Sequence, residues 1–413
     1  MSQDGGSAKP GFRKTPLMSV TQARAVMLAA ARPLVTEQVS LDGALGRILS
    51  DAIKAGRDQP PFAVSAMDGY ALRSADSPGA LRVIGESAAG RGFEGTCEVG
   101  TAIRISTGAA LPDGADTVVI QEDIGRDGNI VTVPPVTPGK NIRPRGGDFS
   151  AGQVLLQPGR RLDGVAVSLA AATGAASVSV FRSPRVAILS SGDELAVPGE
   201  TPGPYQIFDS ATYGIAGLVR SWGGIAQRLA VERDDAGAIA RAAEQGLDGC
   251  DLLVVIGGAS VGDHDHARPA LMRLGLALAV EKIAVRPGKP TWFGAMPRGL
   301  VLGLPGNPSA ALVSAHLFLR PLMEALQGRD PQSCVTTCRA MLAHPLPANG
   351  PREHYLRAQL YADDGGQLTV KSFEDQDSSL ISVFAAANAL IRIMPDAPAQ
   401  AQGARVDVLR LES

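Results

Sequence analysis

The stretch LLVVIGGASVGDHDH, residues 252–266, decides how the rest of the chain is interpreted. Its first five residues, Leu252–Ile256, are all apolar, which is typical of a strand buried on both faces. Glycines, a serine and acidic residues follow directly. In sheets of parallel strands covered by helices, ligands bind beyond the carboxyl ends of the strands. The stretch therefore predicts an α/β domain with a candidate site at this strand end.

Strand and helix patterns alternate on both sides of this stretch. Further strands are predicted at residues 186–189, 225–231, 283–285 and 300–304. Helices are predicted at residues 209–222, 235–245, 267–274 and 309–326. Asp209 is expected to cap the first of these helices, and Pro321 to bend the last. The alternation predicts a three-layer α/β domain with a mainly parallel sheet covered on both faces.

The flanking segments have a different pattern. A capping box at residues 19–22 precedes a predicted helix at residues 23–34, and a second short helix is expected within residues 41–49. Short apolar runs broken by Gly, Pro and Asp predict a β-rich module at residues 51–148, followed by a helix at residues 161–176. After residue 330 the pattern predicts a small β-barrel or sandwich. The polar residues 1–17 are expected to be disordered.

The composition is typical of a globular protein of the cytoplasm. The 413 residues include 45% hydrophobic and 19% charged side chains, and the net charge of −2 gives no basic field for nonspecific nucleic-acid binding. No apolar N-terminal segment precedes a cleavage site, and no run of about 18 apolar residues predicts a membrane span. Four scattered cysteines, Cys97, Cys250, Cys334 and Cys338, are expected to be free thiols rather than disulfides or a zinc site.

The residues after the central strand admit three interpretations. The glycines allow backbone N–H groups to converge on an anion, with the Ser260 hydroxyl as a further donor. His264 and His266 form a candidate metal pair only if they share a face, which a loop entering a helix does not ensure. The third interpretation is a simple turn. The loop has neither the lysine of a Walker motif nor the spacing of a dinucleotide fingerprint.

Charged residues also follow other strands. Glu194, Asp234 and Asp265 are placed to meet above the sheet and to hold Mg²⁺ through oxygen ligands, where the cation would neutralise a bound phosphate. The segment KIAVRPGK, residues 282–289, carries three cations, and its Pro-Gly turn favours an oxyanion role for Lys289. No Ser-His-Asp arrangement for nucleophilic catalysis is evident.

Seven motifs occur in an order that resembles one family. Taken alone, SAMDGYA in the β-rich module is an Asp-Gly turn beside a Met and a Tyr. The set is SAMDGYA (65–71), STGAALPDGADTVVIQED (106–123), NIRPRGGD (141–148), SSGDEL (190–195), IGGASVGDHD (256–265), RPGKP (286–290) and GLPGNPSA (303–310). From residue 18 to residue 412 the chain closely resembles the molybdopterin molybdenumtransferase family of molybdenum cofactor biosynthesis, to which the C-terminal region of gephyrin is related.

This resemblance implies a fold, a reaction and partners. It implies a homodimer whose subunit has a helical linker domain (18–50 and 149–182), an inserted β-rich domain (51–148), an α/β molybdopterin-binding domain (183–329) and a C-terminal β-barrel (330–413). It implies that adenylylated molybdopterin and molybdate react with Mg²⁺, that molybdenum is inserted at the dithiolene, and that AMP is released. A molybdopterin adenylyltransferase is the implied upstream partner.

The resemblance also implies site residues, motif by motif. The implied catalytic residues are Asp68, Thr107, Asp148, Glu194, Asp234, Asp265, Pro305 and Pro308, of which Glu194, Asp234 and Asp265 are also the expected metal ligands. The expected substrate-binding residues are Gly257, Gly258, Ser260, Gly262, Lys282, Arg286, Lys289, Asn307, Arg357, Ser378 and Ser379. Arg357 and the serine pair resemble the molybdate-contacting positions of the family.

Four departures from the family pattern are visible. Residues 146–148 read GGD where relatives often carry GED, Ile256 replaces a hydroxyl residue, Ala211 replaces an Asn, and residues 376–381 lack a glycine. None of them removes an acidic residue of the predicted site. Two other functions remain open, namely a molybdopterin adenylyltransferase with a similar α/β domain and a non-catalytic scaffold of the same fold.

Overall fold

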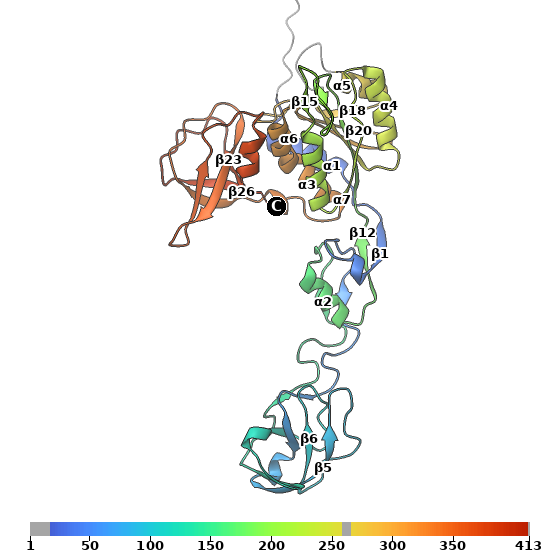
Figure 1. Cartoon of the computed structure of the whole chain (residues 1–413), viewed down its shortest axis with the longest axis vertical. Helices are drawn as coiled ribbons and strands as arrows, with labels where there is room; N and C mark the ends of the chain where they lie inside the picture. The colour runs from blue at the N-terminus through green and yellow to red at the C-terminus, as the bar shows by residue number, and fades with distance from the viewer. Residues whose placement is uncertain (1–16, 258–265, 412–413) are drawn as a thin grey trace, which may run out of the picture. The chain divides into compact units, whose positions relative to one another are not determined.

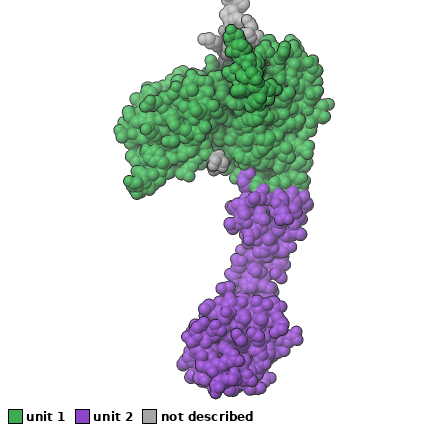
Figure 2. Space-filling view, in the orientation of Figure 1, with its two compact units in different colours: residues 1–37, 46–50, 180–413 green, residues 38–45, 51–179 purple. Residues whose placement is uncertain are grey.

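The computed structural model describes residues 17–257 and 266–411. Its contacts divide the chain into two compact units (Figure 2). Unit 1 consists of residues 1–37, 46–50 and 180–413, and unit 2 consists of residues 38–45 and 51–179. Each unit is therefore assembled from segments that are not contiguous in the sequence.

Unit 1 contains the predicted α/β domain. Its six-stranded sheet has the order β16-β13-β17-β21-β20-β18. The first four strands are parallel, β20 is antiparallel to β21, and β18 is antiparallel to β20, so only β20 runs in the opposite direction. The strands are β13 Arg185–Ser190, β16 Ile225–Arg228, β17 Leu252–Ile256, β18 Ala277–Val280, β20 Trp292–Met296 and β21 Gly299–Leu304. All of β17 is buried, between β13 and β21. The mainly parallel sheet is thus confirmed.

Helices cover both faces of this sheet (Figure 1). Because side chains alternate along a strand, Leu252 and Val254 of β17 pack with α1, α3 and α6, whereas Leu253 and Val255 pack with α4 and α5. The helices are α1 Val20–Ala30, α3 Ala211–Ser221, α4 Ala236–Leu247, α5 Ala267–Arg273, α6 Pro308–Ser314 and α7 Arg320–Leu326. No helix in the described residues combines the length and apolarity needed to cross a membrane.

Local signals placed the ends of these helices well. The Ser19 capping box begins α1, and the Asp209 carboxylate accepts the Thr212 N–H at the start of α3, as predicted. The long helix predicted at residues 309–326 is interrupted between α6 and α7 by a π-helical segment, Ala315–Leu319. Pro321 has no N–H to donate one turn back, so the helical ladder loses a bond there. The helix predicted at residues 309–326 is thus divided into three segments, and a bend at Pro321 stays a prediction.

Two local predictions are wrong. Residues 283–285 do not add a strand to the α/β sheet, because β19, Val285–Arg286, pairs instead with a strand of the C-terminal barrel. Residues 41–49 contain only a 3-10 turn, Leu41–Gly43, rather than a helix. Gly46 adopts a φ of 76°, which cannot continue a right-handed helix.

The C-terminal part of unit 1 is a closed β-barrel. Its strands are β22 Cys338–Leu342, β23 Glu353–Ala362, β24 Leu368–Ser372, β25 Ala389–Ile393 and β26 Arg405–Arg410. They pair in the ring β23-β24-β22-β26-β25, and β25 closes it by pairing with β23. Ala358, Val370 and Val408 fill the interior. Helix α8, Ile381–Ala386, contacts α6. Of the two architectures expected here, the barrel is the one observed.

Unit 2 contains the β-rich module and α2, Gly164–Ala172. Its six-stranded sheet has the order β7-β4-β6-β5-β9-β8. The strands are β4 Gly69–Leu72, β5 Gly79–Ser87, β6 Thr101–Ile105, β7 Thr117–Ile120, β8 Gly125–Asp127 and β9 Ile130–Val133. The short strands of the described chain are β1 Thr36–Ser40, β2 Ile53–Lys54, β3 Val64–Ser65, β10 Ile142–Arg143, β11 Val154–Leu156, β12 Ser177–Phe181, β14 Leu195–Ala196 and β15 Ile207–Phe208.

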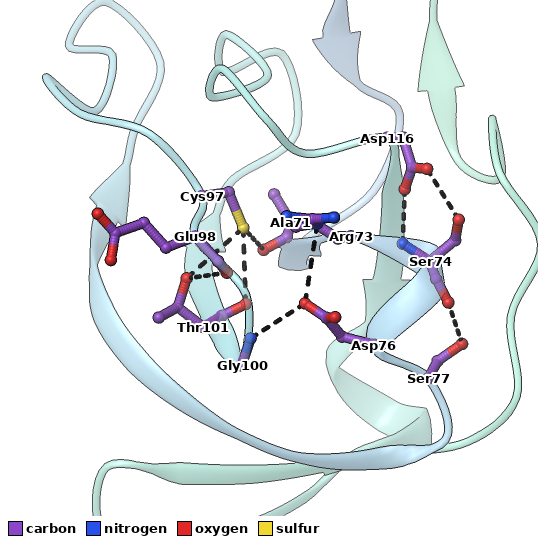
Figure 3. Close-up of polar contacts among 10 residues, drawn as sticks. All are labelled: Ala71, Arg73, Ser74, Asp76, Ser77, Cys97, Glu98, Gly100, Thr101 and Asp116. Carbon is purple, nitrogen blue, oxygen red and sulfur yellow. Dashed lines mark hydrogen bonds and ion pairs between the residues drawn. The ribbon is translucent and has the colours of Figure 1, made fainter.

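Side-chain hydrogen bonds fix the connections of the unit 2 sheet (Figure 3). The Asp116 carboxylate accepts the Ser74 N–H at 2.6 Å and the Ser74 hydroxyl at 2.8 Å. Asp76 accepts the Gly100 N–H at 3.1 Å. The buried Cys97 thiol lies against two backbone carbonyl oxygens, and burial raises its pKa. Cys97 therefore packs as a small protonated side chain.

Candidate functional site

A cleft of about 910 Å³ lies in unit 1 at the carboxyl ends of the parallel strands. One side consists of the segments that follow β13, β16, β17 and β21, and the other consists of the β19 turn and the barrel. The lining includes Ser191, Glu194, Asp234, Gly257, Arg286, Lys289, Pro305, Asn307, Pro308, Arg352, His354, Gln376, Asp377, Ser378 and Ser379. Its location is the one expected for a ligand site in a parallel α/β sheet.

Glu194 and Asp234 form what we call the acidic wall. Their loops run side by side, because Ser191 and Glu232 form a parallel bridge and the Gly192 N–H donates to the Glu232 carbonyl at 3.1 Å. Mg²⁺ is commonly held by one or two carboxylates together with substrate phosphates, so this donor set fits the cation. No group of three His, Cys, Asp or Glu side chains in residues 17–257 and 266–411 is arranged to hold a metal.

The predicted phosphate cradle is described only at its first glycine. Gly257 has a φ of 86°, and a Cβ there would lie 2.9 Å from the Ser191 carbonyl oxygen. Its N–H donates to the Leu304 carbonyl at 3.3 Å and so belongs to the sheet rather than to an anion site. The other selected residues of this loop, Gly258, Ser260, Gly262, His264 and Asp265, lie outside the described residues. His266 is the residue preceding α5.

Arg286, Lys289, Arg352 and His354 form what we call the basic wall. Gly288 has a φ of 114°, and a Cβ there would lie 2.5 Å from the Ser314 hydroxyl. The turn therefore requires glycine, packs on α6 and carries Lys289 into the lining of the cleft. Lys282 does not belong to this wall. It lies outside the cleft lining, and its carbonyl accepts the Met18 N–H at 3.2 Å.

Arg357 is fully buried behind the cleft rather than exposed in it. Its Nη1 donates to the Ser309 hydroxyl and to the Asp377 carbonyl, each at 2.7 Å. The Gln376 side chain accepts the Arg357 backbone N–H at 3.0 Å and its Nε–H at 3.1 Å, and donates to the Arg357 carbonyl at 3.0 Å. The Gln376 side chain thereby makes the two backbone hydrogen bonds with β23 that a neighbouring strand would make. No sequence pattern pointed to this role.

Two loops meet across the cleft. Asn307 Nδ2 donates to the Ser378 hydroxyl at 2.7 Å, which joins the GLPGNP motif to the barrel. The Asp377 carboxylate accepts the Ser379 hydroxyl at 2.6 Å and its N–H at 2.8 Å, and these bonds lower the pKa of Asp377. The structure thus brings Asn307 and the serine pair together with Pro305 and Pro308 of the same motif.

Two buried polar atoms at this site have no hydrogen-bond partner within the described parts of the chain, namely Ser191 Oγ and Arg357 Nη2. A buried polar group without a partner costs about 1–3 kcal/mol. Such groups are rare in folded proteins and point to a molecule that completes their bonding. Ser191, which follows β13, lines the cleft itself, whereas Arg357 of β23 lies behind the cleft on the barrel side.

Unit 2 holds the remaining selected residues, Asp68, Thr107 and Asp148. The Thr107 N–H donates to Asp68 Oδ1 at 2.6 Å and lowers the pKa of Asp68. Three motif segments meet here, because the Ala66 N–H donates to the Asn141 carbonyl and the Gly108 N–H to the Ser65 carbonyl, each at 2.9 Å. Asp148 is exposed at the end of the third segment.

Three family models match the chain in succession. Residues 18–174 match the MoeA N-terminal region (domain I and II), residues 187–325 match a probable molybdopterin binding domain, and residues 339–411 match the MoeA C-terminal region (domain IV). Together they define a multidomain protein of the MoeA type, built around an α/β domain that carries the cleft and a C-terminal barrel that completes it.

Individual relatives agree with this class. The chain is 34% identical to a molybdopterin molybdenumtransferase of Nostoc sp., covering 86% of this chain and 85% of the relative. It is also 34% identical to the enzyme of that name from Haemophilus influenzae, covering 91% and 94%. The crystal structure of a molybdopterin biosynthesis MoeA protein from Pyrococcus horikoshii matches with a TM-score of 0.83 at 29% identity, covering 96% of this chain and 100% of that one. The chain belongs to the molybdopterin molybdenumtransferase family.

Proposed function

We propose that the chain acts as a molybdopterin molybdenumtransferase that joins molybdate to adenylylated molybdopterin in the cleft of unit 1, forms molybdenum cofactor and releases AMP. The observation that supports this is a single cleft with the acidic wall on one side and the basic wall on the other. A phosphoanhydride with its cation suits the first wall, and an oxyanion suits the second. The unpartnered Ser191 Oγ gives the acidic side a further polar contact.

Each group of residues takes a separate task in this proposal. Glu194 and Asp234 hold Mg²⁺, together with Asp265 of the loop outside the described residues. Mg²⁺ would neutralise the phosphate oxygens and ease departure of AMP. Arg286, Lys289 and Arg352 attract molybdate, while Asn307 and the serine pair close the cleft over it. Asp68, Thr107 and Asp148 are proposed as further catalytic residues.

The proposal extends to the setting of the reaction. We propose the four-domain division given by the resemblance, a homodimer in the cytoplasm, and a molybdopterin adenylyltransferase that supplies the adenylylated intermediate. Analytical ultracentrifugation of the whole chain tests the dimer, and a monomer at micromolar concentration would contradict it.

The activity itself is tested with the purified chain, adenylylated molybdopterin, molybdate and Mg²⁺. AMP release and reconstitution of a cofactor-free molybdoenzyme are the two expected readouts. AMP at the level of a control without the chain would contradict the proposal. Adenylylated product made from ATP and molybdopterin would favour the adenylyltransferase instead, and partner binding without turnover would favour the scaffold.

A further inference from the structure

His354 lies in the basic wall, and no sequence pattern pointed to it. In the parallel pairing of β19 with β23 it is the register partner of Arg286. Residues paired in register across neighbouring strands present their side chains on the same face, so Arg286 and His354 line the cleft together. Arg352 lines the same cleft, and its Nη1 lies 3.5 Å from the Val285 carbonyl that it donates to, next to Arg286.

The imidazole is held among cations. Burial and then the positive charges of Arg286, Arg352 and Arg357 lower the pKa of His354 to about 4. The adjacent carboxylate, Glu353, does not offset these charges at the imidazole, because it accepts Arg392 Nε–H at 2.6 Å and the Tyr355 hydroxyl at 2.7 Å.

Among the residues that the structure describes, the remaining surroundings add little negative charge next to the ring, because the charges that shift its pKa are all arginines. On β25 the register partner of His354 is the apolar Ile393. Two residues of the 375–379 loop that line the cleft are Gln376, which is neutral, and Asp377. The Asp377 carboxylate accepts a hydrogen bond from the Ser379 hydroxyl. Within residues 17–257 and 266–411, the other charged side chains of the lining are Lys289, Glu194 and Asp234.

We propose that His354 is the proton donor of an oxyanion subsite formed with Arg286 and Arg352; this rests on the proposed function, which brings molybdate to the cleft. A tetrahedral dianion bound beside the arginines offsets their positive charge at the imidazole and favours its protonated form, so the ring takes up a proton from solvent. Binding and protonation are thereby coupled, so the chain binds the dianion more tightly as pH falls from 8 to 6.

The transfer of molybdenum uses this proton. Molybdate and a dithiol give a trioxo molybdenum dithiolene of the same charge and one water molecule. Two Mo–S bonds form, one Mo–O bond and two S–H bonds break, and two O–H bonds form, while molybdenum keeps its oxidation state. His354 delivers its proton to the departing oxygen and recovers one from a thiol, and the second thiol proton completes the water. No external oxidant or reductant is needed.

Calorimetric titration of the whole chain with molybdate at pH 7, in two buffers of different ionisation enthalpy, counts the protons taken up on binding. We expect an uptake of about half a proton or more for the wild type. His354→Gln keeps a polar side chain without a titrating ring, so its uptake should be near zero. His344→Gln, which alters a histidine outside the cleft lining, is the matched control and should keep the wild-type uptake.

A rate measurement separates proton donation from binding alone. With molybdate at saturation, His354→Gln should slow molybdenum transfer about 100-fold, while His344→Gln leaves the rate unchanged. Unaltered proton uptake in His354→Gln, or a transfer rate within twofold of wild type, would overturn the role of His354 and leave the proposed function intact. If molybdate does not bind to the wild-type chain, both proposals fail together.

Discussion

The two walls of the cleft are encoded differently in the sequence. Glu194 and Asp234 each follow a strand of one parallel sheet, and backbone bonds between neighbouring strand ends hold their loops together. The basic wall combines Arg286 of β19 with Arg352 and His354 of the barrel, which are distant in the sequence. The acidic wall thus follows from a local rule, whereas the basic wall exists only because β19 leaves the α/β domain and pairs with β23.

This difference predicts that a substitution in one wall impairs the binding function of that wall and leaves the other wall intact. The sheet edge keeps its carboxylates in place without help from the barrel, so changes there should act on the cation and the phosphates alone. The basic wall depends on the pairing of β19 with β23 and on the loop that Gln376 holds. Changes in the barrel should therefore act on oxyanion binding and spare the acidic wall.

The largest effect is expected from Asp234→Asn. Loss of one of the carboxylates proposed to hold Mg²⁺ should reduce AMP release about 100-fold, because stabilisation of transition-state charge by a cation amounts to several kcal/mol. Molybdate binding, measured by calorimetry, should change less than twofold. Asp248→Asn, at the end of the sheet opposite the cleft, is the matched control. An equal loss of molybdate binding in Asp234→Asn would show that the walls are not independent.

The next effect is expected on the other wall. Arg286→Ala removes a cation from the register partner of His354 and should raise the Kd for molybdate about 20-fold, with a weaker dependence on salt. Mg²⁺ affinity should stay unchanged. Arg298→Ala removes an exposed arginine at the opposite sheet edge and should behave as wild type. A similar loss in both variants would mean that general positive charge, and not the basic wall, attracts the oxyanion.

A smaller effect is expected from Gln376→Ala, which tests the support of the basic wall. The change leaves the Arg357 backbone N–H and Nε–H without their acceptor and frees the 375–379 loop. Each lost bond costs about 1 kcal/mol, so molybdate binding should weaken about tenfold. Gln359→Ala, an exposed position on β23, the strand that contains Arg357, is the control. Wild-type molybdate affinity in Gln376→Ala would contradict the positioning role.

The acidic wall and the sheet could be predicted from the sequence, and the basic wall only in part. The run at Leu252–Ile256, the Asp209 cap and the acidic strand ends each depend on residues close in sequence. The structure places the run, the cap, Glu194 and Asp234 where they were expected, whereas Asp265 lies outside the described residues. Lys289 was found for the same reason, since a Pro-Gly turn aims it. His354 and Gln376 were missed because their roles arise from strand pairing.

One strand shows why local signals fail. Residues 283–285 have the apolar pattern of a strand, and the pattern is real, but it does not tell which sheet receives the strand. Assigning it to the α/β sheet hid the contact with the barrel that creates the basic wall. Lys282 was selected for its charge beside this strand, yet it is not among the residues that line the cleft.

The smallest effect concerns the free energy of unfolding in acid, and it tests whether the surroundings of His354 disfavour its protonated form. The folded-state pKa of His354 is about 4, below the ordinary value of 6.5, so between these values the unfolded chain binds more protons. Stability should therefore fall as pH drops below 6.5 and stop falling near pH 4. Because the ring is partly exposed, His354 contributes about 1 kcal/mol to the loss of stability at pH 5.

Urea unfolding at pH 8 and pH 5 measures this effect. The free energy of unfolding should fall less between the two pH values for His354→Gln than for wild type. The control, His344→Gln, should lose as much as wild type, and an equal loss in His354→Gln would mean that burial and the arginines do not disfavour the charged ring.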